Sequence, residues 1–192
     1  MARTDNFARV PVASEAELWE WLAEHHGQET SVWLVTSKKG HDGYLSTSQV
    51  LDALIAHGWI DGIRRKHEDP ARTMQLIAPR RMQAWAQSYK DRAAALGAAG
   101  RMHPAGEARI AASKAQGLWD FYADVDALIQ PDDLNAALDA APGARVFFED
   151  CSASYRRNVL RWIKLAKTPA TRAKRIAEAS CTAASGERIP QM

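Results

Sequence analysis

The stretch Gly58-Trp59-Ile60-Asp61-Gly62 decides the fold of this 192-residue chain. Its first glycine follows a segment of helical periodicity and ends that helix, because glycine adopts the left-handed conformation of a helix stop at little cost. Residues 59–66 then predict a strand, residues 68–70 a turn, and residues 73–78 the strand that returns. The stretch therefore predicts an antiparallel hairpin that is entered directly from a helix.

The segments before the hairpin carry alternating helix and strand signals. A capping-box spacing predicts a helix over residues 14–26, and β-branched and aromatic residues predict a strand over 31–36. A second helix is expected from Ser46 or Ser48 up to the hairpin, and residues 7–12 are a candidate edge strand. Several short strands between helices, without strict strand–helix alternation, favour an α+β fold.

The rest of the chain has helical signals only. Alanine-rich stretches, interrupted by glycine and proline, predict helices near residues 82–96, 104–116, 131–140, 143–149, 153–167 and 169–184. We therefore expect an α+β domain over residues 1–100, followed by an all-helical C-terminal region over residues 101–192 that packs on the first domain.

Composition narrows the class of protein. Apolar residues make up 46% and charged residues 25% of the chain, which are ordinary values for a globular protein. The N-terminus has no signal-peptide pattern, and no apolar run approaches the roughly 18 residues that cross a bilayer, so we expect a cytoplasmic protein. Cys151 and Cys181 have no metal or redox spacing and are predicted to be small packing residues.

Charge is segregated along the C-terminal half. Residues 101–150 contain 4 basic and 9 acidic residues, whereas residues 151–192 contain 9 basic and 2 acidic ones. A basic, amphipathic helical segment can bind nucleic acid or an acidic partner, or it can pack against the acidic segment that precedes it. The side chains that would meet such a partner are Arg157, Arg161, Lys164, Arg172 and Arg175.

The hairpin also carries candidate binding residues. Strict strand alternation puts Trp59, Asp61 and Ile63 on one face. A carboxylate among apolar side chains needs hydrogen bonds or a cation, unless its pKa rises, and such groups are common in functional sites. Arg80 or Arg81 is a candidate cation. The alternative is a buried structural pair of Asp61 with an arginine.

Arg80 and Arg81 are two planar cations, and the Trp85 ring follows about one helical turn later. This set suits an anionic or aromatic ligand. These residues follow the returning strand, and a Lys-Lys-Gly loop after the strand over 31–36 is a candidate cover, although a plain solvated loop is the alternative. The predicted ligand-binding residues are Trp59, Asp61, Arg80, Arg81, Trp85 and Lys39. No metal-ligand spacing, nucleophile elbow or phosphate-binding glycine loop is present, so we expect no metal and no cofactor.

Several motifs, in order, resemble the YdeI/OmpD-associated (OmdA), or bacteriocin-protection, family. They are Val32-Trp33-Leu34, Gly58-Trp59-Ile60-Asp61-Gly62, Pro79-Arg80-Arg81 with Trp85, Gly100-Arg101-Met102, Pro131-Asp132-Asp133-Leu134 and Arg161-Trp162-Ile163-Lys164. The resemblance implies a YjbR/CyaY-like fold, a small antiparallel sheet packed by helices, with a helical C-terminal region after it. It also implies a link to stress or bacteriocin resistance, and no particular reaction.

The chain departs from the family pattern beside the candidate site. Ala56 and His57 stand where the family usually has a cysteine and an aromatic residue, and Gln83, Ala86 and Tyr89 stand where it has two serines and an asparagine. The loss of these polar groups favours a binding protein over an enzyme. Three functions follow as hypotheses: a small anionic ligand held in the N-terminal domain, a nucleic acid or acidic partner held by the basic helices, and an enzyme with Asp61 as general base.

Overall fold

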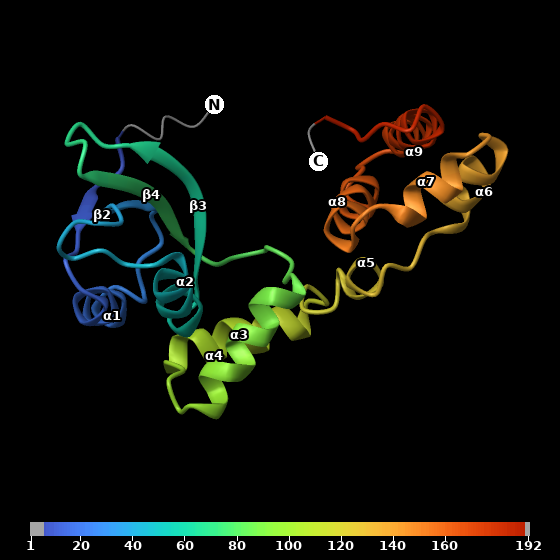
Figure 1. Ribbon diagram of the computed structural model, residues 1–192. Helices are drawn as coiled ribbons and strands as arrows, with labels where there is room; N and C mark the ends of the chain where they lie inside the picture. The colour runs from blue at the N-terminus through green and yellow to red at the C-terminus, as the bar shows by residue number, and fades with distance from the viewer. Residues whose placement is uncertain (1–5, 191–192) are drawn as a thin grey trace. The chain divides into compact units, whose positions relative to one another are not determined.

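A four-stranded sheet organises the first part of the chain (Figure 1). The computed structural model describes residues 6–190. Its sheet-bearing elements, in chain order, are β1 (Arg9–Pro11), α1 (Glu15–Glu24), β2 (Val32–Ser37), α2 (Thr47–Ala56), β3 (Trp59–Lys66) and β4 (Arg72–Pro79). The predicted hairpin of β3 and β4, and its direct entry from α2, are confirmed.

The sheet is mixed, and the prediction of an antiparallel sheet was wrong at one edge. The strand order is β1-β2-β4-β3; β1 pairs with β2 in parallel, and the other two pairs are antiparallel. The reason is the crossover through α1, which returns the chain to the same end of the sheet before β2 begins. The edge strand itself lies where the sequence predicts it.

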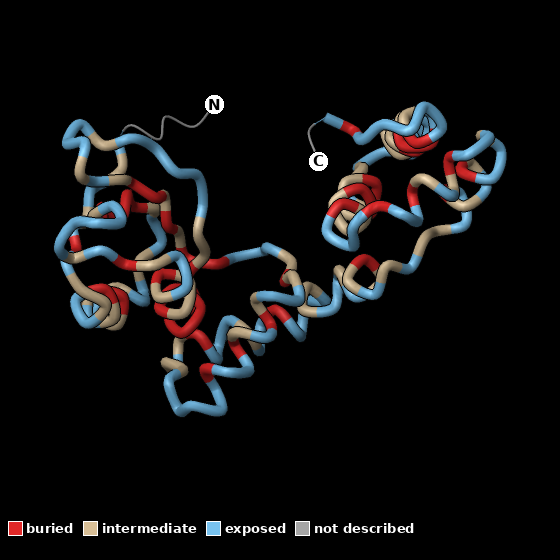
Figure 2. The backbone as a smooth tube through the Cα atoms, viewed as in Figure 1, coloured by how far each residue is buried: buried red, intermediate tan, exposed pale blue. Residues whose placement is uncertain are grey.

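Helices α1 and α2 pack on one face of the sheet. Their buried residues Leu18, Leu22 and Leu54 form one cluster with Trp59 of β3 and Ile77 of β4. Figure 2 shows this buried layer along β2, β4 and the inner side of α2. Burial of each such side chain contributes about 1.5–3 kcal/mol, so this face of the hairpin is strongly fixed.

A bulge in β3 changes which side chains face the helices. Asp61 pairs with Ile77 and Arg64 pairs with Gln75, so two residues of β3 lie opposite Leu76 alone. An extra residue of this kind shifts the alternation by one position. Arg64 therefore lies on the face of Asp61, and Ile63 is exposed, which corrects the prediction that Ile63 shares that face.

Two more helices complete the first unit: α3 (Gln87–Ala98) and α4 (Pro104–Ala115). Both pack near the end of α2, where Gly106 of α4 lies against the carbonyl oxygen of Ala56. The described chain divides into two units, the first ending at Asp120 and the second beginning at Phe121. The first unit thus includes α4, which packs against α2.

From residue 121 to residue 190, all the described helices and strands are helices, so the predicted α+β fold class with an all-helical C-terminal region is confirmed. Its helices are α5 (Ala123–Asp126), α6 (Asp132–Ala140), α7 (Ala144–Asp150), α8 (Ala153–Lys164) and α9 (Pro169–Ala184). Its core includes Leu134, Phe148, Val159 and Ile176, together with Cys151. Cys181 is exposed, so the prediction that both cysteines are packing residues was right for Cys151 only.

The described residues contain neither a membrane-spanning helix nor a cluster of metal ligands. Among residues 6–190, no helix is both long and apolar enough to cross a membrane. Within the same range, no group of three or more His, Cys, Asp or Glu side chains is placed to hold a metal ion.

Candidate functional site

A polar pocket of about 200 Å³ lies in the first unit, where β2 ends and α2 begins. Three of its lining side chains are cationic, namely Lys38, Lys39 and Arg64, and none is acidic. The other lining residues are mostly hydroxyl- or amide-bearing: Thr36, Ser37, Tyr44, Thr47, Thr73 and Gln75, with Leu45 and Val50 as the apolar part. The pocket thus has many hydrogen-bond donors, and the charged side chains that line it are all positive.

Arg64 reaches this pocket because of the bulge in β3. Its Nη2 donates to the Gln75 side-chain oxygen at 3.1 Å and to the Thr47 hydroxyl at 3.3 Å. Thr47 is the first residue of α2, whose N-terminus is capped by Ser46 and Gln49 in a capping box. The positive end of a helix dipole therefore adds to the charge of the guanidinium at this end of the pocket.

The two lysines come from the loop that follows β2. The loop is tied to the β3–β4 hairpin, because the Lys38 ammonium donates to the Pro70 carbonyl oxygen at 2.7 Å and the Lys38 amide donates to the Ala71 carbonyl oxygen at 2.8 Å. It is also held near its end, where Gly43 has a positive φ and lies against the backbone of Ala13. Lys39 is exposed and lines the pocket, so the loop places an exposed cation at its rim.

The predicted residues Asp61, Arg80 and Trp85 meet beside this pocket. The Arg80 guanidinium lies 3.9 Å from the centre of the Trp85 ring and 5.4 Å from that of Tyr89. Asp61 accepts hydrogen bonds from the Tyr89 hydroxyl and, at 3.4 Å, from the Gln75 amide nitrogen. Tyr89 thus lies between the acid and the arginine, with its hydroxyl on Asp61 and its ring beside the Arg80 guanidinium.

Asp61, Arg80, Trp85 and Tyr89 form a second cluster, which is closed to solvent at its arginine. Trp85 and Arg80 are 1% and 2% exposed. Burial lowers the pKa of Arg80 to about 10, against the opposing effects of Tyr89 and Asp61. Burial also raises the pKa of Tyr89, and the hydrogen bond to Asp61 raises it further. A ligand could not reach the Arg80 guanidinium without displacing packed rings.

The remaining predicted site residues lie apart. Trp59 packs in the core with its ring edge-on to Trp21, 5.5 Å between centres. Arg81 is at the surface, where its guanidinium donates to the Glu29 carbonyl oxygen at 2.8 Å. Of the six predicted residues, Lys39 alone is among those that line the polar pocket.

Sequence reasoning missed Arg64, Gln75 and Thr47. Strict alternation placed Arg64 on the face opposite Asp61, and a one-residue bulge reverses that assignment. Gly62 is the one signal that could have revealed the bulge, since an isolated glycine inside a strand pattern often marks one.

The five basic residues predicted to bind a partner make contacts within the second unit. Lys164 forms an ion pair with Asp124 at 2.6 Å, and Arg172 makes two hydrogen bonds to Asp133, at 2.6 and 2.8 Å. Further contacts are those of Arg157 with the Asp126 carbonyl oxygen, Arg161 with the Tyr122 ring, and Arg175 with the Trp162 carbonyl oxygen and ring. The acidic partners belong to the acidic segment, as one of the two alternatives expects. Binding of a partner through these residues stays a prediction.

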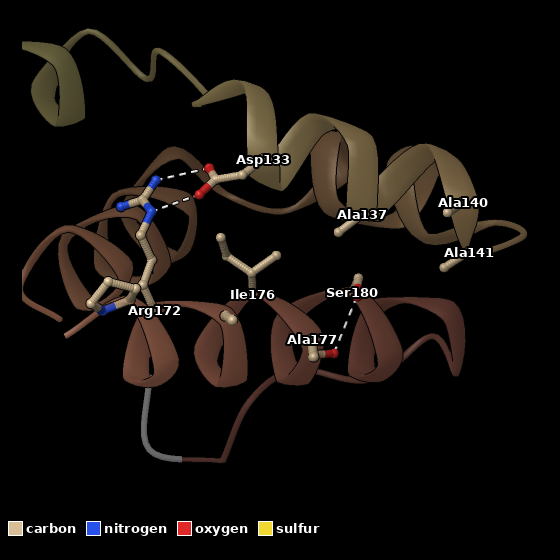
Figure 3. Close-up of a pocket in the computed structure, with 10 residues that line it drawn as sticks. Asp133, Ala137, Ala140, Ala141, Arg172, Ile176, Ala177 and Ser180 are labelled. Atoms are coloured by element: carbon tan, nitrogen blue, oxygen red, sulfur yellow. Dashed lines mark hydrogen bonds and ion pairs between the residues drawn. The ribbon is translucent and has the colours of Figure 1, made fainter.

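A groove of about 610 Å³ runs between α6 and α9 in the second unit (Figure 3). The Asp133–Arg172 pair lies at one end, and Ile176 points from α9 toward α6. Most of the other lining side chains are alanines. Its one acid and one cation are joined to each other, so the groove offers an apolar surface and no free charge.

Fold and site together define a two-unit α+β protein whose sheet-bearing unit carries a cationic pocket. The chain belongs to the family described as a domain of unknown function (DUF8412), whose model matches residues 10–109. Its second unit carries an OmdA domain, described as "Bacteriocin-protection, YdeI or OmpD-Associated", at residues 127–186. No curated protein and no solved structure matches the chain.

The resemblance to the OmdA family is thus confirmed for the C-terminal unit. The motifs around Gly58 and Arg80 lie in residues 10–109, which match the other family instead. The likeness to the YjbR/CyaY-like group stays a prediction.

Proposed function

We propose that the first unit binds a small oxyanion of about the size of phosphate in the pocket lined by Lys38, Lys39 and Arg64. The observation that carries this proposal is the lining itself: three cations, several hydroxyl groups and no carboxylate. The proposal keeps the small anionic ligand predicted from the sequence and moves its site from the closed arginine of the second cluster to the open pocket. The OmdA description supports a role of the whole protein in bacteriocin resistance, which is part of the same proposal.

The size and chemistry of the pocket favour a compact oxyanion. At about 200 Å³ it is smaller than the roughly 300–1,000 Å³ typical of sites for drug-sized ligands. Phosphate accepts hydrogen bonds on every side, which suits a ring of hydroxyl donors and an arginine fork. The N-terminus of α2 adds a further preference for negative charge. A free phosphate ion and the terminal phosphate of a small metabolite satisfy the same donors.

Calorimetric titration of the whole protein with inorganic phosphate tests the proposal. Arg64→Ala should weaken binding at least tenfold, because a hydrogen bond to a charged group contributes about 1.5–3 kcal/mol. Arg81→Ala is the matched control: it removes one positive charge from the same unit at a residue outside the pocket. Sodium chloride keeps the ionic strength constant throughout, so that screening does not differ between samples.

Two outcomes would count against the site. Wild-type protein that gives no heat with millimolar phosphate and no rise in its unfolding temperature would remove the proposed function. Equal losses of affinity in the two variants would show that phosphate responds to net charge and not to this pocket.

A further inference from the structure

A continuous chain of side-chain hydrogen bonds leads from α3 to the rim of the pocket. The Tyr89 hydroxyl donates to one carboxylate oxygen of Asp61. The Gln75 amide nitrogen donates to the other at 3.4 Å, and the Gln75 amide oxygen accepts from Arg64 at 3.1 Å. Of these residues, Gln75 and Arg64 line the pocket and Asp61 and Tyr89 do not.

The direction of the Gln75 amide depends on Asp61. An amide has one donor end and one acceptor end, whereas a carboxylate only accepts. With Asp61 ionised, the nitrogen of Gln75 must face Asp61, and its oxygen must then face the guanidinium of Arg64. The reverse orientation would put two acceptors together at Asp61 and two donors together at Arg64. Gln75 is 7% exposed, so little water is available to relieve such a conflict.

We infer that Asp61 is a positioning residue for Arg64, and that it acts through Gln75 to hold the guanidinium at the start of α2, facing the anion pocket. Asp61 does not touch the ligand. Tyr89 fixes the carboxylate from the side of α3, and the buried Arg80 guanidinium provides a nearby positive charge. The inference rests on the proposed function for its consequence in binding, but the geometry of Arg64 can be measured without any ligand.

Asp61→Asn tests this role with a change of one atom type. The introduced amide has one oxygen for two donors, the Tyr89 hydroxyl and the Gln75 NH₂ group. Gln75 therefore loses the charged acceptor that fixes its direction, and its NH₂ group is no longer held away from Arg64. Phosphate affinity should fall about fivefold to tenfold, the effect of weakening one charged hydrogen-bond arrangement. The sign is informative, because loss of a negative charge would by itself tighten the binding of an anion.

Asp52→Asn is the matched control. Asp52 lies on α2 and pairs with Arg92 at 2.6 Å, so its substitution makes the same change in charge within the same unit without involving Gln75. Its phosphate affinity should equal or slightly exceed that of the wild type. An Asp61→Asn protein that binds phosphate as tightly as Asp52→Asn would overturn the inference.

The ligand-free readout separates the inference from the proposed function. In ¹⁵N spectra of the whole protein without phosphate, Asp61→Asn should move the Gln75 side-chain amide signals and the Arg64 Nε–H signal, and Asp52→Asn should move neither. Unchanged Gln75 and Arg64 signals would sink the positioning role even if phosphate binds. Changed signals in a protein that binds no phosphate would retain it and remove the proposed function. Should Asp61→Asn fail to fold, Tyr89→Phe removes the donor that fixes the Asp61 carboxylate without touching Gln75 or Arg64. It should move the Gln75 and Arg64 signals, and unchanged signals would overturn the inference.

Discussion

His57 is a buried titratable residue at the end of α2, and it makes the first unit sensitive to mild acid. It is 3% exposed, its Nδ1 lies 2.8 Å from the Ala53 carbonyl oxygen, and its ring stacks on that of His103 with 5.0 Å between centres. Burial lowers its pKa below the usual 6.5, and the charges of His103 and His26 lower it further, although the bond to Ala53 opposes this. The folded protein therefore binds this proton less readily than the unfolded chain does.

The sign of the pH effect follows from that difference. The contribution of neutral His57 to the free energy of unfolding is fully present above pH 6.5. It is lost as the pH drops below that value, because the unfolded chain takes up the proton first. The urea midpoint should decrease between about pH 7 and about pH 5, and the decrease should be smaller in His57→Gln. His41→Gln, which removes an exposed loop histidine, should behave as the wild type does. If the urea midpoint decreased with pH by the same amount in all three proteins, this role of His57 would be contradicted.

Arg80 should contribute to stability in a way that lysine cannot replace. Its planar guanidinium stacks on Trp85 and donates to the Gln83 carbonyl oxygen at 3.1 Å. Arg80→Lys should lower the free energy of unfolding by about 2 kcal/mol, the value of a desolvated cation–π contact. Arg81→Lys, at the surface, should change it by less than about 0.5 kcal/mol. Urea unfolding measures both free energies, provided that their dependence on urea concentration is the same as in the wild type. Equal losses of stability in the two variants would contradict a special role of the Arg80 guanidinium on the Trp85 ring.

At the scale of single residues, the sequence indicated which side chains lie near one another better than it indicated which of them are exposed to solvent. Residue types alone pointed to Asp61, Arg80 and Trp85 as one group, and they are one group. The residue types left open whether this group binds a ligand or forms a buried structural pair, because the burial of Arg80 depends on how Trp85 and Tyr89 pack against its guanidinium. Arg64 was assigned to the wrong face for a similar reason, since ladder pairing and not local alternation sets its position.

Among elements, the approach of α4 to α2 depends on one glycine. A Cβ on Gly106 would overlap the Ala56 carbonyl oxygen, whereas a Cβ on Gly97 of α3 would meet nothing within 4 Å. Gly106→Ala should therefore destabilise the protein by about 2–3 kcal/mol. Gly97→Ala should stabilise it by up to about 1 kcal/mol, because alanine is the better helix former. Thermal unfolding of the two variants compares the same chemical change in two settings, and a similar shift in both would be inconsistent with close contact at Gly106.

Helix ends were the most predictable part of the elements. Ser14 and Ser46 cap the helices that their spacing predicts, and Gly58 ends α2 with a φ of 76°. These signals are local, so a single sequence contains them. The parallel pairing of β1 is not local; three residues at a sheet edge have no pattern that tells which direction their neighbour runs.

For the whole molecule, the two units should fold independently. The buried clusters of the first unit use residues up to Leu96, with Trp119 packed against one of them, and the buried cluster of the second spans Val125 to Ile189. In the second unit the Tyr155 hydroxyl also accepts a hydrogen bond from the Ile189 amide at 3.0 Å, which holds the segment after α9. No described core cluster contains buried residues from both units.

A fragment of residues 121–192 should thus unfold cooperatively by itself. Domains of this size, although marginal, do fold alone. Its one tryptophan, Trp162, and its helical circular dichroism should report the same midpoint. A fragment of residues 101–192, cut at the boundary that the sequence predicts, should show the same midpoint, because α4 would have lost its partner α2. Different unfolding midpoints from the Trp162 signal and from circular dichroism would show that the fragment does not unfold as one cooperative unit.

The bulge at Gly62 and Ile63 also decides how this strand should be compared with others. Counted forward from Trp59, the arginine of the pocket is the sixth residue of β3; counted backward from Lys66, it is the third, in uninterrupted register with β4. A chain shorter by one residue at the bulge would keep an arginine opposite the equivalent of Gln75 only when aligned from the hairpin turn. Alignment from the helix end would put a gap in the wrong place and hide the shared residue. The reference point for finding this site in another sequence is therefore the turn between β3 and β4. The Gly58-Trp59 pair at the start of the strand does not serve this purpose.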